Sequence, residues 1–88
     1  MAVTRQVVKA YIIGMLADDL GIPTSHFTEN DDLRNDYLFD DPSLVMFGKQ
    51  INKAQWHNVF VTPPEIVACQ TVGAVIDLVL GKIKDTSS

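Results

Sequence analysis

Cysteine is nearly absent from this chain of 88 residues, where Cys69 is the only one. A single cysteine excludes an internal disulfide framework and favours a reducing compartment, so we expect a cytoplasmic protein. Apolar stretches are short as well, because glycines or Asp77 interrupt them before the roughly 20 residues that a membrane span needs. No basic segment followed by an apolar segment and a small-residue cleavage site opens the chain, so we expect neither a membrane span nor export.

Basic residues are scarce between residues 18 and 41, where eight acidic residues accompany one base, Arg34. The rest of the chain has three acidic and six basic residues. An acidic block of this kind repels nucleic-acid phosphate, so we expect no nucleic-acid partner, and it favours basic partners. The other interpretation is an acidic loop that only faces solvent, which is what charge blocks usually do.

Residues suited to catalysis or metal binding are few. The two histidines and the single cysteine form no recognisable Cys–His signature, so we expect that the protein is not an enzyme. The run ENDD at 29–32, with Asp36, lacks the glycine and final glutamate of a calcium loop and predicts at most weak binding of divalent ions. We expect Cys69 to be a small buried apolar residue, and Trp56 with His57 to fill the junction after the second helix.

Apolar residues recur at helical spacing in two long segments. From Thr4 to Leu20 they form one face, with Thr4 as the cap and Gly21 as the stop. From residue 72 to about residue 84 they form another face, which begins after a cap at Thr71. These patterns predict the first and last helices.

Two prolines mark helix starts between those segments. Asp41 as a cap, with Pro42 at the first helical position, begins a helix whose buried stripe is Leu44, Phe47, Ile51 and Ala54. A second start at Thr62 to Glu65 reads as a capping box and leaves room only for a short helix. Gly48 inside the earlier helix costs about 1 kcal/mol relative to alanine, and it permits a close neighbour there or is simply tolerated.

Residues 21–41 form a long connection in which short turns are expected. Six apolar residues are predicted to pin it across the bundle: Ile22, Phe27, Leu33, Tyr37, Leu38 and Phe39. The only strand candidate, residues 59–62, is too short to pair alone. The sequence therefore predicts one all-α domain over residues 1–88, with a core at about 4–84 and a polar tail at 85–88. It contains three main helices, one short helix and a long loop between the first two.

This order of elements resembles the acyl carrier protein family. The run LGIPTSHFTENDDLRND resembles the end of the first helix and the start of the loop in carrier proteins, and VFVTPPEIVACQTVGAVIDLVLGKI matches their third and fourth helices without a gap. The run DYLFDDPSL falls where the family has Asp-Leu-Gly-x-Asp-Ser-Leu. This attachment motif is degenerate here: it has two extra residues before Ser43, lacks the glycine, and has Pro42 directly before the serine.

The resemblance implies that Ser43 carries a covalent 4′-phosphopantetheine arm, whose thiol holds an acyl intermediate as a thioester. It implies as partners a phosphopantetheinyl transferase and acyl-transferring or synthase enzymes, in a specialised fatty-acid or polyketide-type pathway of lipid or polyketide biosynthesis. The expected assembly state is a monomer. A second hypothesis is an unmodified adaptor of the same four-helix-bundle fold, which binds a protein partner through its acidic loop and second helix.

Ser43 and its neighbours are the candidate site residues. At the predicted second helical position, Ser43 would sit among unpaired backbone amides at the positive end of the helix dipole, which favours a phosphodiester. The alternative role for Ser43 is simply to help begin the helix. The candidate partner-binding residues are Asp40, Asp41, Leu44, Val45 and Met46. Val45 and Met46 either form a docking surface or pack under the long loop, and the sequence leaves both alternatives open.

Overall fold

The described residues of the chain fold into helices and turns. A computed structural model describes residues 4–53 and 59–87, and side chains to residue 83. Its elements are α1 (Arg5–Leu20), the 3₁₀ turn η1 (Thr24–His26), α2 (Asp41–Asn52), α3 (Pro63–Val67) and α4 (Val72–Ser87). The described part of the chain has no strand, only one isolated antiparallel bridge between Asp32 and Thr71. The predicted all-α class, with three main helices and one short helix, is therefore confirmed.

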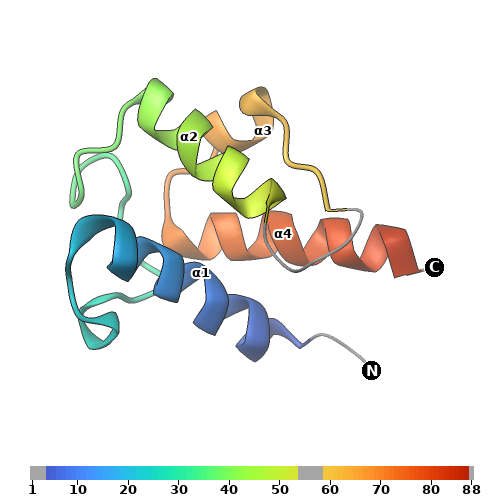
Figure 1. Cartoon of the computed structure of the whole chain (residues 1–88), viewed down its shortest axis with the longest axis horizontal. Coiled ribbons are helices and arrows are strands. Elements are labelled where there is room, and N and C mark those ends of the chain that lie inside the picture. Colours follow the sequence, from blue (N-terminus) through green and yellow to red (C-terminus); the bar gives the residue numbers. More distant parts are fainter. Residues whose placement is uncertain (1–3, 54–58, 88) are drawn as a thin grey trace.

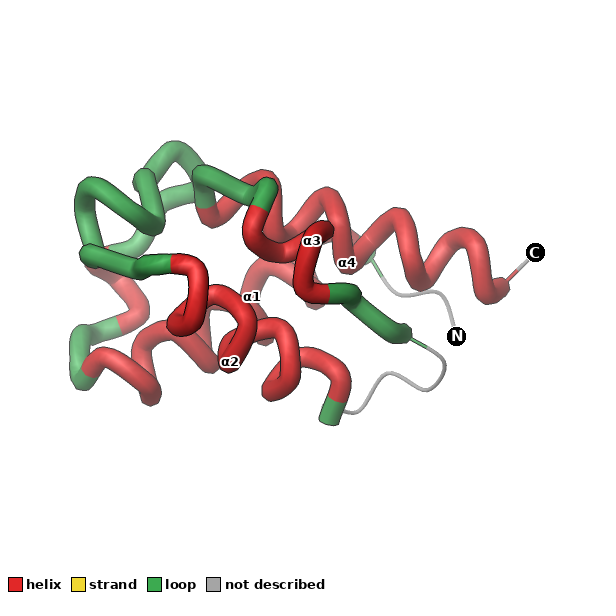
Figure 2. Tube along the Cα trace, turned by 90° about the horizontal axis from the view of Figure 1, so that it is seen from above, coloured by secondary structure: helices red, strands yellow, loops and turns green. Residues whose placement is uncertain are grey.

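The helices pack as two pairs. In Figure 1, α1 and α4 lie along one another on one side of the molecule, and α2 and α3 cover them from the other side. The view from above in Figure 2 shows the long connection crossing one end of the bundle. This arrangement brings the end of the acidic loop to the start of α2.

The predicted ends of α1 and the starts of α3 and α4 are confirmed. Thr4 caps α1 by accepting a hydrogen bond from the N–H of Val7, and Gly21 ends the helix in the left-handed conformation with φ +68°. Thr71 accepts from the N–H of Ala74 at 3.1 Å, which caps α4. The signals are local, so sequence alone locates these boundaries.

The start of α2 differs from the prediction by one residue. Asp40, not Asp41, is the N-cap, so Asp41 and Pro42 occupy the first two helical positions and Ser43 the third. Both registers are chemically acceptable, because aspartate caps helices well and proline is tolerated throughout the first turn. The path of the preceding loop selects Asp40. At the other end of the chain, α4 continues through residues 85–87, which the sequence analysis assigned to the polar tail.

One hydrophobic core joins the helices and the long loop. Three of the predicted loop anchors, Phe27, Leu33 and Phe39, are buried, and Ile22 and Tyr37 pack against the core while remaining partly exposed. The prediction for Leu38 was wrong, since it is 83% exposed and adopts φ +60°. The α2 residues Leu44, Phe47 and Ile51 are buried as predicted, whereas the predictions for Ala54, Trp56 and His57 lie outside the described residues.

Backbone hydrogen bonds attach the acidic loop to the start of α4. The N–H groups of Val72 and Gly73 donate to the carbonyls of Asp31 and Glu29 at 3.1 and 2.9 Å. The N–H of Leu33 donates to the carbonyl of Gln70 at 2.8 Å. The first amides of a helix have no partners within the helix, so the loop carbonyls satisfy them. The loop is thereby fixed at the end of the bundle where Ser43 lies.

Gly48 permits the close contact of α2 with α3. A Cβ at position 48 would lie 3.3 Å from Cγ2 of Ile66, which is completely buried. The side chain of Asn52 makes a second connection, accepting from the N–H of Val61 at 2.7 Å and donating to its carbonyl at 3.1 Å. This pairing joins Val61 to the end of α2, and the neighbouring Phe60 is exposed.

Candidate functional site at the start of α2

Ser43 lies on the surface in the first turn of α2. Its side chain is exposed, and its position at the third helical residue follows from the Asp40 cap. The long loop ends immediately before it, with Phe39 inserted into the core and packed edge-on against Phe47 at a ring-centre distance of 6.2 Å. These contacts fix the start of α2 and leave the Ser43 hydroxyl accessible.

Asp40 orients the Ser43 hydroxyl. One oxygen of the carboxylate accepts hydrogen bonds from the backbone N–H of Ser43 at 2.9 Å and from its hydroxyl at 2.7 Å. These bonds, the hydroxyl bond above all, hold the pKa of Asp40 below its usual value. The carboxylate is therefore ionised at neutral pH, and the lone pairs of Ser43 Oγ point away from this bond.

The helix start offers fewer free amides than the sequence analysis expected. Pro42 has no N–H, the N–H of Ser43 is bound to the Asp40 side chain, and the N–H of Leu44 donates to the Asp40 carbonyl at 3.0 Å. The expectation that Ser43 sits among unpaired amides was therefore wrong. A phosphate on Ser43 would gain from the helix dipole but would also face the negative charge of Asp40.

Arg34 balances part of that negative charge. Its guanidinium donates to the Asp41 carboxylate at 2.6 Å and to the carbonyl of Val67, in α3, at 3.1 Å. The residue thus connects the loop, the first turn of α2 and the end of α3. Sequence reasoning did not assign this role, although Arg34 is the only base among the eight acids of residues 18–41, which is the signal that points to it.

A cleft of about 300 Å³ adjoins Ser43 and is called the Ser43 cleft below. It lies between the end of α1, the loop and α2, and its lining includes Leu20, Tyr37, Leu38, Ser43, Met46 and Gln50. Leu38 and Met46 are 83% and 57% exposed, so the cleft opens beside two solvent-exposed apolar side chains. Sequence reasoning named Met46 but missed Leu38, because it expected that side chain to be buried.

The candidate docking residues divide between surface and core. Asp40, Asp41 and Met46 are exposed and Val45 is partly exposed, so these four are accessible to a partner. Leu44 is completely buried, and its assignment as a partner-binding residue was wrong. Its position one residue after Ser43 turns it toward the core, whose centre it shares with Phe47.

A second groove lies on the other side of α2, between α2 and α3. It has a volume of about 230 Å³, and its lining includes Val45, Gly48, Lys49, Phe60, Pro63 and Ile66. Phe60 is 64% exposed at its edge. The sequence signal for the exposed Phe60 was its place between two valines at residues 59–61, since alternate residues of such a segment face opposite sides and both valines are buried. Exposed apolar side chains therefore lie on both sides of α2.

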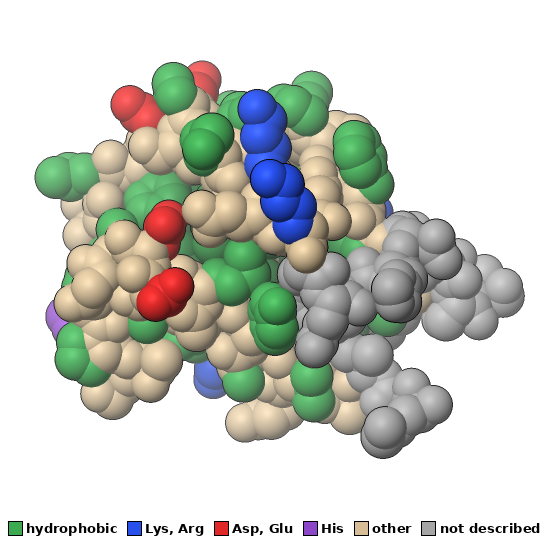
Figure 3. All heavy atoms as spheres, in the orientation of Figure 1, with side chains coloured by type: hydrophobic (Ala, Val, Ile, Leu, Met, Phe, Trp, Pro, Cys, Tyr) green, Lys and Arg blue, Asp and Glu red, His purple; other side chains and the backbone are tan. Residues whose placement is uncertain are grey.

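Charge changes sign along α2. Asp40 and Asp41 are exposed at its start, and Lys49 and Lys53 are exposed in its second half. Figure 3 shows acidic side chains around the end of the bundle where the loop meets α2, and basic side chains over the middle of the same face. Neither lysine forms an ion pair with a residue that the structure describes.

The loop carboxylates serve as turn acceptors. Asp31 accepts from the hydroxyl of Tyr37 and from the N–H and hydroxyl of Thr28, and these bonds, the Tyr37 bond first, lower the pKa of Asp31. Asp32 accepts from the backbone N–H groups of residues 34 and 35, both at 2.9 Å. The described residues contain no group of three His, Cys, Asp or Glu side chains able to hold a metal ion.

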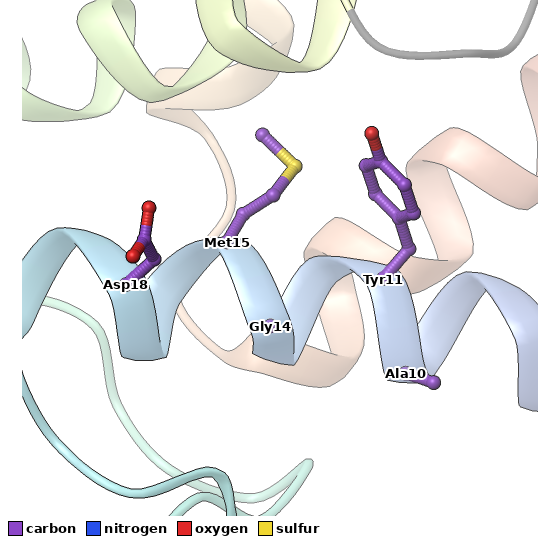
Figure 4. Close-up of a pocket in the computed structure, with 5 residues that line it drawn as sticks. All are labelled: Ala10, Tyr11, Gly14, Met15 and Asp18. Carbon is purple, nitrogen blue, oxygen red and sulfur yellow. The ribbon is translucent and has the colours of Figure 1, made fainter.

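A further hollow, of about 460 Å³, runs along α1. Figure 4 shows Tyr11 and Met15 pointing to the same side of the helix, with Asp18 as the one charged side chain in the set. All five lining residues come from a single helix, so no groups from different elements converge there. Cys69 is also unsuited to chemistry, since burial raises the pKa of its thiol and disfavours the reactive thiolate.

Comparisons with known protein families and with curated proteins find no match to this chain. Among the described helices, none is long and apolar enough to cross a membrane.

Proposed function

We propose that this protein is an acyl carrier whose Ser43 bears 4′-phosphopantetheine. The observation that carries the proposal is the exposed Ser43 hydroxyl in the first turn of α2, directly after a long acidic loop. A covalent arm there can swing away from the bundle without disturbing the core, because Leu44 and Phe47 provide the packing of this turn. Partner enzymes would approach the same exposed end of α2.

The backbone of Leu38 supports the resemblance to the carrier family. When DYLFD is aligned with the family's Asp-Leu-Gly-x-Asp, Leu38 takes the place of the glycine. Leu38 is the only non-glycine residue in the described chain with positive φ, at +60°, a conformation that glycine adopts easily and leucine rarely does. The turn before α2 thus contains a backbone conformation that glycine adopts without strain, at the position where this alignment places the family's glycine.

Attachment changes the hydrogen bonds of the first turn in a defined way. The transferase would join Ser43 Oγ to the phosphorus of the phosphopantetheine group of coenzyme A, releasing the adenosine bisphosphate and the hydroxyl proton. Asp40 would lose the hydroxyl as a donor but keep the N–H of Ser43, so the helix cap would persist. The pairing of Arg34 with Asp41 limits the charge repulsion that the new phosphate meets.

The test is the intact mass after incubation with coenzyme A and a broad-specificity phosphopantetheinyl transferase. We expect a mass gain of one phosphopantetheine group in the wild type, none in Ser43→Ala, and an unchanged gain in Ser25→Ala. Ser25 is the matched control, because it is also exposed and lies in the short turn η1. The proposal is wrong if the wild type gains no mass under conditions that modify an established carrier.

An unmodified adaptor is the second candidate function. The hydrogen bond from the Ser43 hydroxyl to Asp40 gives this serine a structural role without any modification. The exposed Asp40, Asp41 and Met46 would then serve partner binding alone. This function is favoured if the wild type gains no mass and if Ser43→Ala loses only the stability that a serine provides at a helix start.

A further inference from the structure

Three large apolar side chains are exposed across α2. Leu38 and Met46 are 83% and 57% exposed at the Ser43 cleft, and Phe60 is 64% exposed at the groove on the other side of the helix. Val45, partly exposed, lines that second groove. Exposed apolar groups that gather in this way mark interaction surfaces more often than scattered single ones do. We call these four residues the α2 apolar strip.

The backbone of Leu38 adds a second observation. A leucine in the left-handed region is strained, and burial of the side chain does not compensate, because the side chain faces solvent. Strain of this kind tends to persist at sites of function. A glycine or asparagine would fit this backbone better, so the apolar side chain itself is the feature that needs an explanation.

Charge defines the rest of the surface. Met46, Lys49 and Lys53 follow one another on the exposed ridge of α2 at helical spacing, whereas Asp40 and Asp41 stand at its start. From Asp41 to Lys53 the helix rises about 18 Å, at about 1.5 Å per residue. Within the α2 apolar strip, Val45 and Met46 lie on α2 between these two charged ends, and Phe60 shares its groove with Lys49.

We infer that the α2 apolar strip docks a partner protein of mixed charge. The partner places an apolar contact on Leu38 and Met46, basic side chains near Asp40 and Asp41, and acidic side chains near Lys49 and Lys53. A partner with a uniformly basic surface would match only the start of α2 and would meet two lysines at the other end. Charge complementarity of this kind sets which partner binds and in what orientation.

The docking surface deepens the proposed function, since it names the chemistry of the partner that reaches Ser43. It rests on the proposed function in one respect only, namely the reaction that the partner carries out at Ser43. The docking surface itself is the same in a carrier and in an adaptor. Its test therefore uses the unmodified protein, so that a failure of docking and a failure of Ser43 modification are read in separate experiments.

The experiment is an NMR titration with three helical peptides of about 14 residues, long enough to cover α2 at about 1.5 Å per residue. The peptides share one leucine stripe and differ only at their ends: arginines at one end and glutamates at the other, arginines at both ends, or glutamates at both ends. A peptide can bind in either direction, so a mixed peptide with its two charged ends exchanged could not be distinguished from the original one. The three charge patterns used here remain different in both directions. We expect the mixed peptide to bind about fivefold more tightly than either other peptide, as one or two exposed ion pairs allow.

Variants locate the contact. Leu38→Asn, which suits the left-handed backbone, should weaken binding of the mixed peptide by about fivefold, since it removes apolar area from the contact. Val7→Asn is the matched control, because Val7 is 46% exposed on α1 and lines neither groove. The double variant Lys49→Glu, Lys53→Glu should move the preference to the peptide with arginines at both ends.

Several outcomes would overturn the inference. Equal binding of the three peptides would show that the charge pattern selects nothing, and equal affinity of Leu38→Asn and wild type would exclude the apolar contact. Shift changes confined to residues away from α2 would place the binding elsewhere. Self-association of the protein through the α2 apolar strip, seen in sedimentation without peptide, would make a second copy of the chain the occupant.

Discussion

Asp40 and Ser43 are joined twice, because one carboxylate oxygen of Asp40 accepts both the backbone N–H of Ser43 at 2.9 Å and its hydroxyl at 2.7 Å. The first bond caps α2 and the second orients the hydroxyl that the proposed modification uses. The same residue therefore begins the helix and prepares the candidate attachment site. Both functions can be separated by substitution, since removing the hydroxyl leaves the cap in place.

Removing the Ser43 hydroxyl should raise the pKa of Asp40. The hydroxyl bond is the largest cause of the lowered pKa, and the backbone bond is the next, so Ser43→Ala should return the value only part of the way. The measurement is a carboxyl ¹³C NMR titration of both proteins. Ser25→Ala serves as the control and should leave the titration of Asp40 unchanged. An identical titration in Ser43→Ala would show that the hydroxyl does not bind Asp40 in solution.

Glu65 should make the stability of the fold depend on pH. Its carboxylate pairs with Lys82 at 2.7 Å and accepts from the N–H and hydroxyl of Thr62, and these contacts, Lys82 first, lower the pKa of Glu65 to about 2. A folded pKa below the unfolded value means that ionised Glu65 stabilises the fold above the unfolded pKa of 4.5. The contribution is lost as the pH falls from there to about 2.

The matched variant is Glu65→Gln, which keeps a capping residue but has no charge. In urea unfolding, the wild type should be the more stable protein at neutral pH, and the difference should shrink steadily as the pH falls from about 4.5 to about 2. Other carboxylates titrate in both proteins and cancel in this difference. A gap that stayed constant across the titration would contradict the assigned pairing with Lys82.

Local signals predicted most of the helices, and the path of the loop explains most of the misses. Thr4, Gly21 and Thr71 act within a few residues of themselves, so their effect can be predicted from sequence. The choice between Asp40 and Asp41 as the cap cannot be predicted in this way. Both residues closely precede the proline, and the approach of the loop decides between them.

The candidate site was predictable in part. The position of Ser43 in the first turn of α2 follows from the Asp-Pro start, whereas its hydrogen bond to Asp40 depends on the register of the cap. Leu38 was misassigned because the loop contains several apolar residues, and the sequence does not indicate which of them faces solvent. Backbone N–H and carbonyl groups attach the loop to α4, and the identity of the side chains does not specify which backbone groups will pair.

Gly14 and Gly48 should respond differently to alanine. A Cβ at Gly14 meets nothing within 4 Å, so Gly14→Ala should stabilise α1 by about 1 kcal/mol through helix propensity. At Gly48 the same gain is opposed by the contact with buried Ile66 at 3.3 Å, so Gly48→Ala should gain less. Urea unfolding of the two variants provides the comparison. Equal stabilisation would mean that α2 and α3 are not in close contact at this position.

Gly73 should be intolerant of a side chain, because it lies where the acidic loop meets α4. A Cβ there would stand 3.1 Å from the backbone oxygen of Glu29, the same atom that accepts the N–H of Gly73 at 2.9 Å. Since a backbone atom cannot rotate away, Gly73→Ala should lower the free energy of unfolding by about 1 to 3 kcal/mol, as other overpacked substitutions do. Urea unfolding measures this loss.

Gly81 supplies the control in the same helix, since a Cβ at that position meets nothing within 4 Å. Gly81→Ala should stabilise α4 by about 1 kcal/mol, so the two variants should change stability in opposite directions. Amide hydrogen exchange then identifies the part of the fold that is affected. In Gly73→Ala, protection should fall first at the N–H groups of Leu33 and Val72, which hold the loop to the helix. If those amides remained as protected as in the wild type, the loop would not depend on the close approach at Gly73.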